Sequence, residues 1–314
     1  MESAIHEIEE IKPMDLSVHS RVSNLSDILE ESCLPKQNMR VFDSDQENAS
    51  RVQKIDDIDH VYSSITRYML LDTLTCCRIP SNIQSFLYDM QTDKLNEATE
   101  MMKLLDIYFF YSDFESIIEA NLEILILSSE IDCAEYFLSR CLTLCAEPTY
   151  FSFMLVATFL SHTVLSFFIE YACFRIMYII EFCFDVLYRR IFWQFFKSHD
   201  DYEKLLLYCV KFNDHMEPEP TASKLAATFY EINWINRVKD CINVTGDGFS
   251  LTESERELFE TFYSIECAED MSSELDKDLI GSLESEPGFK FHRVSSCGSK
   301  CYCYLDYVNQ FPWA

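Results

Sequence analysis

The sequence predicts an all-α protein, and two observations carry this prediction. No glycine occurs before Gly246 in a chain of 314 residues. Phosphate-binding loops, dinucleotide-binding turns and tight β-hairpins use glycine where the backbone takes φ > 0 or approaches a ligand closely. The chain is also 48% apolar, and its apolar residues recur at helical spacing over long stretches. Helices packed on helices around a large core are therefore expected.

The helices of the first half follow from apolar residues spaced three and four apart. The second of them follows the helix-start signal Pro80–Ser81–Asn82. The four predicted helices contain Ile58, Tyr62, Ile65 and Met69; Ile83, Phe86, Leu87 and Met90; Met101, Met102, Leu105 and Ile107; and the stretch from Phe114 to Leu127.

The second half begins after the short polar break SSEID at 128–132. Apolar stripes then continue from Tyr136 to about Val238, with breaks predicted at 147–148, 198–201 and 217–220. The chain is thereby divided into four parts. We expect a flexible acidic N-terminal extension at 1–53, two helical units at 54–130 and 131–245, and an acidic, partly disordered C-terminal tail at 246–314.

One segment raises an alternative in which the protein associates with a membrane. Phe151 to Ile169 carries no formal charge, and apolar residues continue to Phe196, so by length this region could span a bilayer. A second span would have to bury charged side chains, each at a cost of a few kcal/mol at the bilayer centre. Those charges are Glu170, Arg175, Glu181 and Asp185. Two buried core helices explain the pattern with fewer penalties, so a membrane is not the expected partner.

The charge and cysteine content exclude several classes of function. A net charge of −28 leaves no basic stripe to neutralise phosphates, so no nucleic-acid partner is expected. Cys141 and Cys145, or Cys297, Cys301 and Cys303, could ligate zinc, but no paired C-x-x-C set accompanies them, and inert thiols are favoured. Hydrolase motifs are missing as well. No metal, cofactor or small-molecule ligand and no enzymatic activity are predicted. His162, on an apolar helix, is interpreted as a core histidine with satisfied hydrogen bonds.

Several short segments, in order, resemble helices of the cyclin family. The matching segments are SITRYML (64–70), DKLNE (93–97), TEMMKLLDIYF (99–109), FESIIEANLEIL (114–125), EYFLSR (135–140), VATFLSHTVL (156–165), DYEKLLLYCVKF (201–212) and KLAATFYEINWINRV (224–238). The resemblance implies two tandem five-helix cyclin boxes, one at 54–130 and one at 131–245. Two departures accompany it. The family's first helix keeps only Met39 and Arg40, and bulky residues at 173–182 replace a helix of small ones.

The resemblance also implies which residues contact a partner. Cyclins hold a cyclin-dependent kinase through a lysine and a glutamate of the first box, which correspond here to Lys94 and Glu119, with Leu95 and Leu122 as apolar neighbours. The substrate-docking positions would be Met39, Arg40 and Asn82.

The expected function is that of a regulatory subunit. The chain would bind and activate a cyclin-dependent protein kinase, control cell-cycle progression, and occur in the nucleus and cytoplasm. The alternatives are a membrane-associated helical protein that uses residues 151–196, or an adaptor with the cyclin fold that does not activate a kinase.

Overall fold

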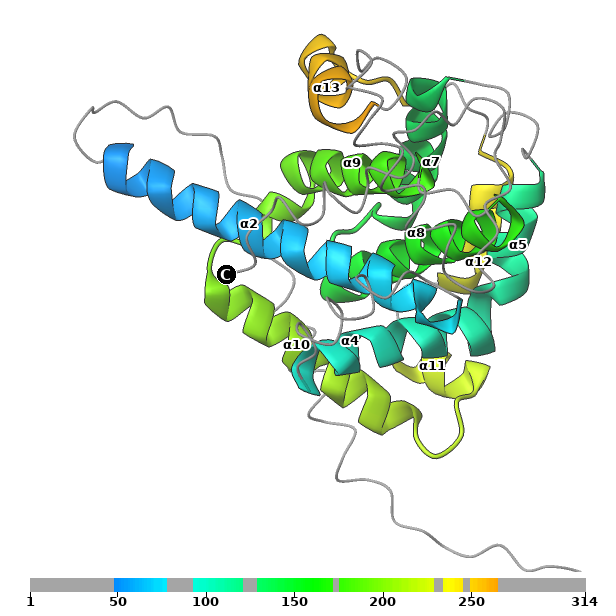
Figure 1. Cartoon of the computed structure of the whole chain (residues 1–314). Coiled ribbons are helices and arrows are strands. Elements are labelled where there is room, and N and C mark those ends of the chain that lie inside the picture. The colour runs from blue at the N-terminus through cyan, green and yellow to red at the C-terminus, as the bar shows by residue number, and fades with distance from the viewer. Residues whose placement is uncertain are drawn as a thin grey trace, which may run out of the picture. The chain divides into compact units, whose positions relative to one another are not determined.

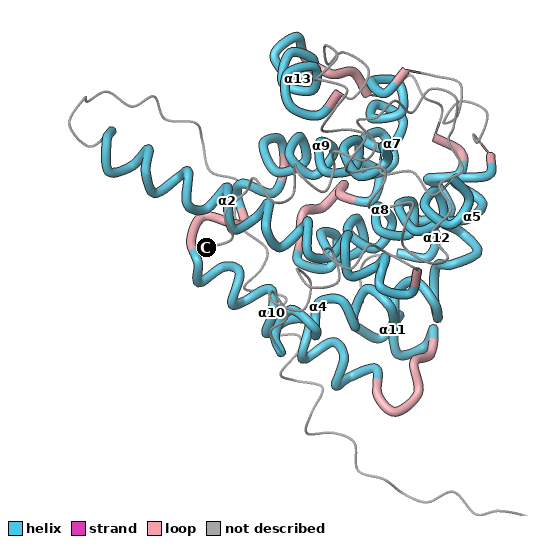
Figure 2. The backbone as a smooth tube through the Cα atoms, viewed as in Figure 1, coloured by secondary structure: helices cyan, strands magenta, loops and turns pink. Residues whose placement is uncertain are grey.

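A computed structural model describes residues 48–77, 93–120, 129–171, 175–228, 234–244 and 249–264, which all belong to one compact unit spanning Val41–Ala314. These residues form helices and connecting loops and no strand, as Figure 2 shows, so the predicted all-α class is confirmed. The α-helices are α2 (Asn48–Thr73), α4 (Asp93–Leu104), α5 (Tyr111–Glu119), α7 (Glu130–Leu144), α8 (Tyr150–Tyr171), α9 (Arg175–Arg190), α10 (His199–Met216), α11 (Ala222–Thr228), α12 (Trp234–Ile242) and α13 (Glu253–Leu258).

Four shorter helical elements complete the described fold. Two are 3₁₀ turns, η1 (Leu74–Cys76) and η3 (Phe192–Gln194). Two are π-helical turns, η2 (Leu105–Phe110), which joins α4 to α5, and η5 (Phe259–Tyr263), which continues α13. The elements α4, η2 and α5 follow one another without an intervening loop from Asp93 to Glu119, and Phe110, at φ −125° and ψ 3°, departs from helical geometry at the junction of η2 and α5.

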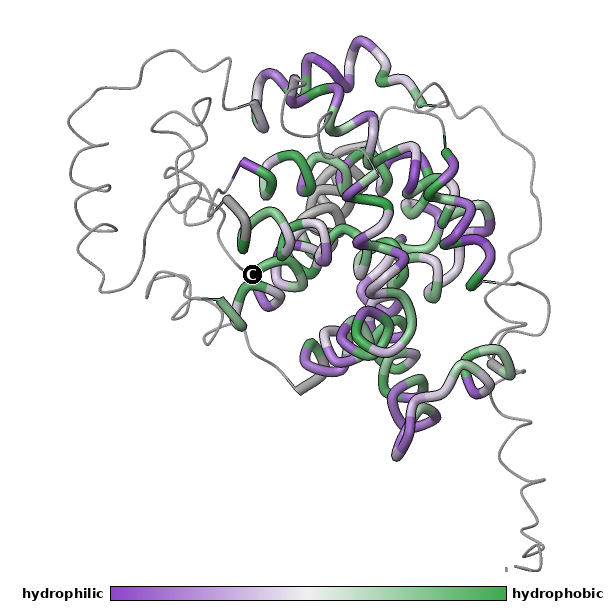
Figure 3. Tube along the Cα trace, turned by 90° about the vertical axis from the view of Figure 1, so that its right-hand side faces the viewer, coloured by the Kyte–Doolittle hydropathy of each residue, from purple (hydrophilic) through white to green (hydrophobic). Residues whose placement is uncertain are grey.

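Helix α8 lies at the centre of the core. Every residue from Phe151 to Val164 is buried, as expected of a helix that is apolar all round. Its first turn is fixed by Thr149, whose hydroxyl accepts a hydrogen bond from the Ser152 amide at 3.0 Å. Helices α2, α4, α5, α7 and α9 all pack against α8 (Figure 1). Hydrophilic and hydrophobic residues alternate along the helices in Figure 3, the pattern of amphipathic helices around a shared core.

The helices of the two predicted cyclin boxes share this core. Helices α4 and α5, and α2 apart from its first six residues, lie in the predicted unit 54–130, and α7 to α12 lie in the predicted unit 131–245 apart from Glu130. The first group packs on α8 together with α7 and α9, α10 packs along α4, and α12 packs on α5 and α7. The described helices thus make one packing arrangement, and the division into two boxes stays a prediction.

The apolar segment that suggested a membrane is largely covered by other helices. Among the described residues, one helix, Tyr150–Ile169, is long and apolar enough to cross a membrane, and 78% of its most apolar window is buried inside the protein. Three of the four charges that follow it pair within the protein, and Arg175 and Glu181 among them are buried. Arg175 donates to Glu130 at 3.1 Å, Glu181 accepts from Arg67 at 2.7 Å, and Asp185 accepts from Arg189 at 2.9 Å. This burial and pairing are what core helices require.

The helix ends agree with the sequence signals, with two differences. The predicted break at 147–148 follows the end of α7. The break at 198–201 includes the start of α10, and the break at 217–220 follows its end. Ile107, however, is 64% exposed and does not share the buried stripe of Met101, Met102 and Leu105, because it lies two residues after Leu105, and residues two apart do not share a face of a helix. Residues 249–264, assigned to the tail, form α13 and η5 packed on the helices. The predicted helix at 83–90 lies outside the described residues.

Candidate protein-interaction surface

The predicted kinase-contacting residues fall at the two ends of the segment Asp93–Glu119. Lys94 lies in the first turn of α4, although its side chain is not described, and Leu95 beside it is half-buried. Glu119 is the last residue of α5 and is exposed. Leu122, Met39, Arg40 and Asn82 lie outside the described residues. The structure therefore places three of the predicted positions on one segment, Lys94 and Leu95 at its start and Glu119 at its end.

Large apolar side chains are exposed in the middle of this segment. Ile107 is 64% exposed, Tyr108 59% and Tyr111 51%. They are three of seven large hydrophobic residues that are exposed in the described part of the chain. Single exposed apolar residues are ordinary, but neighbouring ones on a firmly packed element are typical of a protein-binding surface. We call Ile107, Tyr108 and Tyr111 the aromatic patch.

The opposite side of the same segment anchors it in the core. Met101, Leu105, Phe110, Phe114 and Ile117 are all 1% exposed or less. Both sides are apolar here because the sequence of the π-helical turn is LDIYFF, and the turn affects which of its apolar side chains face inward. Inserting one residue into a helix changes which side chains face inward, and such turns often occur at functional sites. Here Ile107 and Tyr108 face solvent while Leu105 and Phe110 remain buried.

A buried histidine connects this segment to α8. His162 is 2% exposed; its Nδ1 lies 2.7 Å from Asp106 Oδ1 in η2, and its Nε2 lies 3.1 Å from Glu115 Oε1 in α5. Ser166 of α8 donates a further hydrogen bond to Glu115 at 3.0 Å. The Tyr111 ring meets the imidazole edge-on, with centroids 5.2 Å apart. The aromatic patch therefore has direct contact with the polar cluster beneath it.

The two carboxylates impose a proton requirement on this cluster. A neutral imidazole has one N–H and can donate to only one carboxylate. Both contacts are hydrogen bonds only when the ring is an imidazolium or when one carboxyl group is protonated. Either state holds η2 and α5 against α8 and leaves one net negative charge below the patch. The chemistry suits positioning of a surface more than catalysis, because both ring nitrogens are already engaged.

Sequence reasoning found part of this cluster. The interpretation of His162 as a satisfied core histidine is confirmed by its burial and its two polar contacts. Asp106, Glu115 and Tyr111 were missed as its partners. Asp106 and His162 lie 56 positions apart and carry no spacing motif, so no local signal in a single sequence connects them.

The buried cysteines among the described residues have the character of inert thiols. Burial raises the pKa of Cys141 and Cys183 well above the usual 9.0, and burial raises that of Cys241 to about 12. No group of three or more possible metal ligands occurs among the residues that the structure covers. Cys297, Cys301 and Cys303 lie outside those residues.

Comparison with protein-family profiles, with curated proteins and with solved structures found no match to this chain.

Proposed function

We propose that this protein is a non-enzymatic regulatory subunit that binds a cyclin-dependent protein kinase through the segment Asp93–Glu119. The observation that carries the proposal is the aromatic patch, which lies on this segment between Leu95 and Glu119. The resemblance of the surrounding residues to cyclins supplies the identity of the partner. Apolar and aromatic side chains exposed on a rigid element are suited to the centre of an interface, and the charged Lys94 and Glu119 are suited to its rim.

The mechanism follows from the rigidity of the surface. Its inner side is buried in the core, and His162 fixes η2 and α5 to α8. A surface of this kind can favour one of two conformations of a mobile helix in a kinase, provided that it binds that conformation more tightly. Ile107, Tyr108 and Leu95 would supply the apolar contact, and Lys94 and Glu119 the polar contacts that set the register.

A pull-down of endogenous kinases with the tagged full-length chain, followed by a histone-kinase assay, tests the proposal. Lys94→Ala and Glu119→Ala are each expected to weaken kinase association by more than about tenfold, because removing one member of a desolvated polar pair costs roughly 2–5 kcal/mol. Tyr108→Ala is expected to weaken it comparably. Helicity and melting temperature should stay nearly unchanged, since Tyr108 and Glu119 are exposed.

Matched controls separate this surface from the rest of the molecule. Glu100→Ala and Lys103→Ala change exposed charges on the same segment, and Trp193→Ala removes an aromatic residue that is 49% exposed on η3. None of the three should affect kinase capture. If controls and patch variants weaken capture alike, or if no kinase is captured, the proposal is wrong. Capture of a kinase without stimulation of its activity favours the adaptor alternative.

A further inference from the structure

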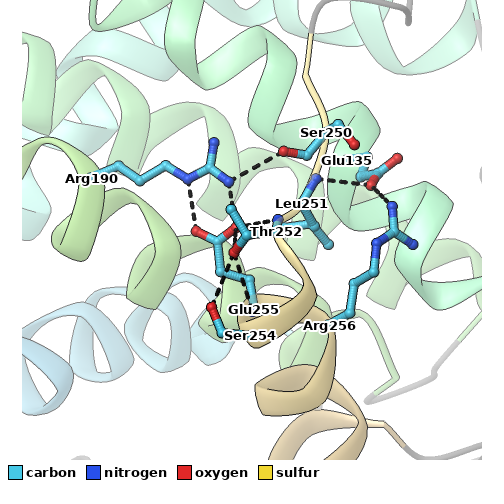
Figure 4. Close-up of polar contacts among 8 residues, drawn as sticks. All are labelled: Glu135, Arg190, Ser250, Leu251, Thr252, Ser254, Glu255 and Arg256. Carbon is cyan, nitrogen blue, oxygen red and sulfur yellow. Dashed lines mark hydrogen bonds and ion pairs between the residues drawn. The ribbon is translucent and has the colours of Figure 1, made fainter.

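A second surface of the protein lies on α7 and α9, where the chain's own C-terminal part is bound. We call residues 249–264 the C-terminal strap. Figure 4 shows two of its neighbouring residues, Glu255 and Arg256, directed to different helices. Glu255 accepts hydrogen bonds from Arg190 of α9, with Nε 2.7 Å from Oε1, and Arg256 donates to Glu135 of α7. Adjacent opposite charges on the strap thus pair with opposite charges on two separate helices.

Backbone groups of the strap use the same two side chains. Arg190 also donates to the Ser250 carbonyl at 3.2 Å, and Glu135 accepts from the Leu251 amide at 3.0 Å. Each of these helix residues therefore binds both the side chain and the main chain of the strap. This arrangement selects the direction and register of the bound segment as well as the signs of its charges. In a reversed segment the backbone amide and carbonyl would not reach Glu135 and Arg190.

Apolar contacts complete the attachment along the strap. The Phe259 ring packs against Phe182 of α9 with centroids 4.8 Å apart, and the Tyr263 ring lies 5.5 Å from the same phenyl ring. At the two ends, Phe249 lies under the Arg190 guanidinium at 4.4 Å, and Ser264 donates to Glu130 of α7 at 2.9 Å.

The strap is too short to be stable on its own. Helix α13 has six residues and η5 has five, whereas isolated helices shorter than about 12–15 residues are marginal in water. Its conformation therefore depends on the surface that binds it. The four residues Glu130, Glu135, Phe182 and Arg190, which we call the docking face, supply the contacts on α7 and α9.

We infer that the docking face is a binding site for a short helical segment and that the strap occupies it in cis. The recognised chemistry is an adjacent Glu–Arg pair followed by aromatic residues three and seven positions after the arginine, as in Glu255, Arg256, Phe259 and Tyr263. A peptide with this chemistry occupies the same face in trans once the strap has been displaced. This inference is independent of the proposed kinase surface, which lies on other helices.

Reversing the strap charges in the full-length chain tests the first half of the inference. Glu255→Arg together with Arg256→Glu places like charges opposite Arg190 and Glu135 and is expected to detach the strap. Amide hydrogen exchange of residues 251–263 should become roughly tenfold faster or more, as loss of hydrogen bonds between charged groups implies. The matched control is the swap Lys239→Asp with Asp240→Lys, two neighbouring exposed residues on α12, and it should leave this exchange unchanged.

A synthetic peptide of residues 247–266, labelled with a fluorophore, tests the second half. It should bind the strap-reversed chain about tenfold or more tightly than the wild-type chain, whose docking face is occupied. A peptide with Glu255 and Arg256 exchanged should not bind. Adding Glu135→Arg and Arg190→Glu to the strap-reversed chain should restore part of the slow exchange, because the two ion pairs form again while the bonds to the Ser250 carbonyl and the Leu251 amide do not. This partial recovery separates the charge contacts from any loss of helix capping or folding.

Three outcomes overturn the inference. The first is unchanged exchange of the strap after its charges are reversed. The second is a detached strap whose docking face does not bind the wild-type peptide. The third is exchange that is equally fast in the chain with only the strap charges reversed and in the chain with both sets of charges reversed.

Discussion

Buried charges in this protein are paired across long distances in the sequence. Arg67 of α2 donates to Glu181 of α9 through Nε at 3.0 Å and Nη2 at 2.7 Å, and both side chains are 6% exposed. A bidentate pair of this kind satisfies each charge by the other. Removing one member leaves a buried charge without compensation, whereas removing both does not.

A double-mutant cycle on this pair has a defined expected outcome. Glu181→Leu alone should lower the free energy of unfolding by roughly 3–5 kcal/mol, and Arg67→Met alone by a similar amount. The double variant should lose much less than the sum of the two, because no charge is stranded. Urea unfolding of the four proteins measures these values, and additive losses would show that the two side chains do not depend on each other.

The thiols offer a prediction that needs no variant. Burial raises the pKa of Cys141, Cys183 and Cys241, so these thiols are protonated and inaccessible at neutral pH. Cys76 is the one described cysteine that is exposed. Mass spectrometry after brief alkylation of the native chain should find Cys76 modified and the three buried thiols unmodified. Rapid labelling of Cys141 would mean that α7 is more open than described.

The sequence predicted which side chains are buried better than it predicted their hydrogen-bond and ion-pair partners. The sequence marked His162 as a core residue because its neighbours on α8 are apolar. It could not reveal Asp106 and Glu115 as its partners, since an ion pair between distant positions depends on how helices pack. The same holds for Arg67, which the sequence placed on a helix without indicating Glu181.

At the level of elements, the strap is expected to respond to acid. Burial alone would raise the pKa of Glu255, but hydrogen bonds from Arg190 and Thr252 outweigh it and place that pKa below the usual 4.5. A carboxyl group with a lowered pKa in the folded state stabilises that state above its unfolded pKa. The stabilisation is lost as pH falls through the folded-state value.

The strap should therefore stay bound at neutral pH and detach only in acid, at pH values below about 4.5. The exchange of amides 255–263, measured between pH 7 and pH 3, follows this transition. Glu255→Gln removes the titrating group, so its strap should be weaker at neutral pH and less dependent on pH. A strap equally pH-dependent in this variant would show that another group controls it.

Most helix ends were predictable because they carry local signals. Ser129 and Asp132 form a capping box at the start of α7, within the polar break that the sequence indicated. The strap was missed because its acidic composition favours a solvated tail. Its signal was the pair Thr252 and Glu255, a T-x-x-E capping box that is recognisable three residues apart.

For the whole molecule, the shared core predicts cooperative unfolding. Helices from both predicted boxes pack on α8, and α10 packs along α4. If 54–130 unfolded separately from 131–245, the apolar residues of α8 that pack against α2, α4 and α5 would be exposed to water. Calorimetry of the full chain should show one main transition, with equal calorimetric and van't Hoff enthalpies. Two resolved transitions would instead support independent boxes.

The all-α class was predictable at this scale because missing glycine and helical periodicity constrain every element at once. The arrangement was not, since many helix pairings satisfy the same apolar stripes. The exposed position of Ile107 illustrates the limit. The predicted stripe groups it with Met101 and Leu105, but it lies six and two residues after them, and at about 100° per residue these offsets place it on the other side of the helix.

The central position of α8 also has a consequence for synthesis of the chain. Helix α2 is complete at Thr73, but its partner α8 ends at Tyr171. At translation rates of about 5–20 residues per second, the interval between them is on the order of ten seconds. During that time the apolar sides of α2, α4 and α5 have no core to join, and nascent chains on neighbouring ribosomes can associate through them. Chaperones that bind apolar segments at the ribosome would therefore matter more for this protein than for one whose helices pack against their immediate neighbours.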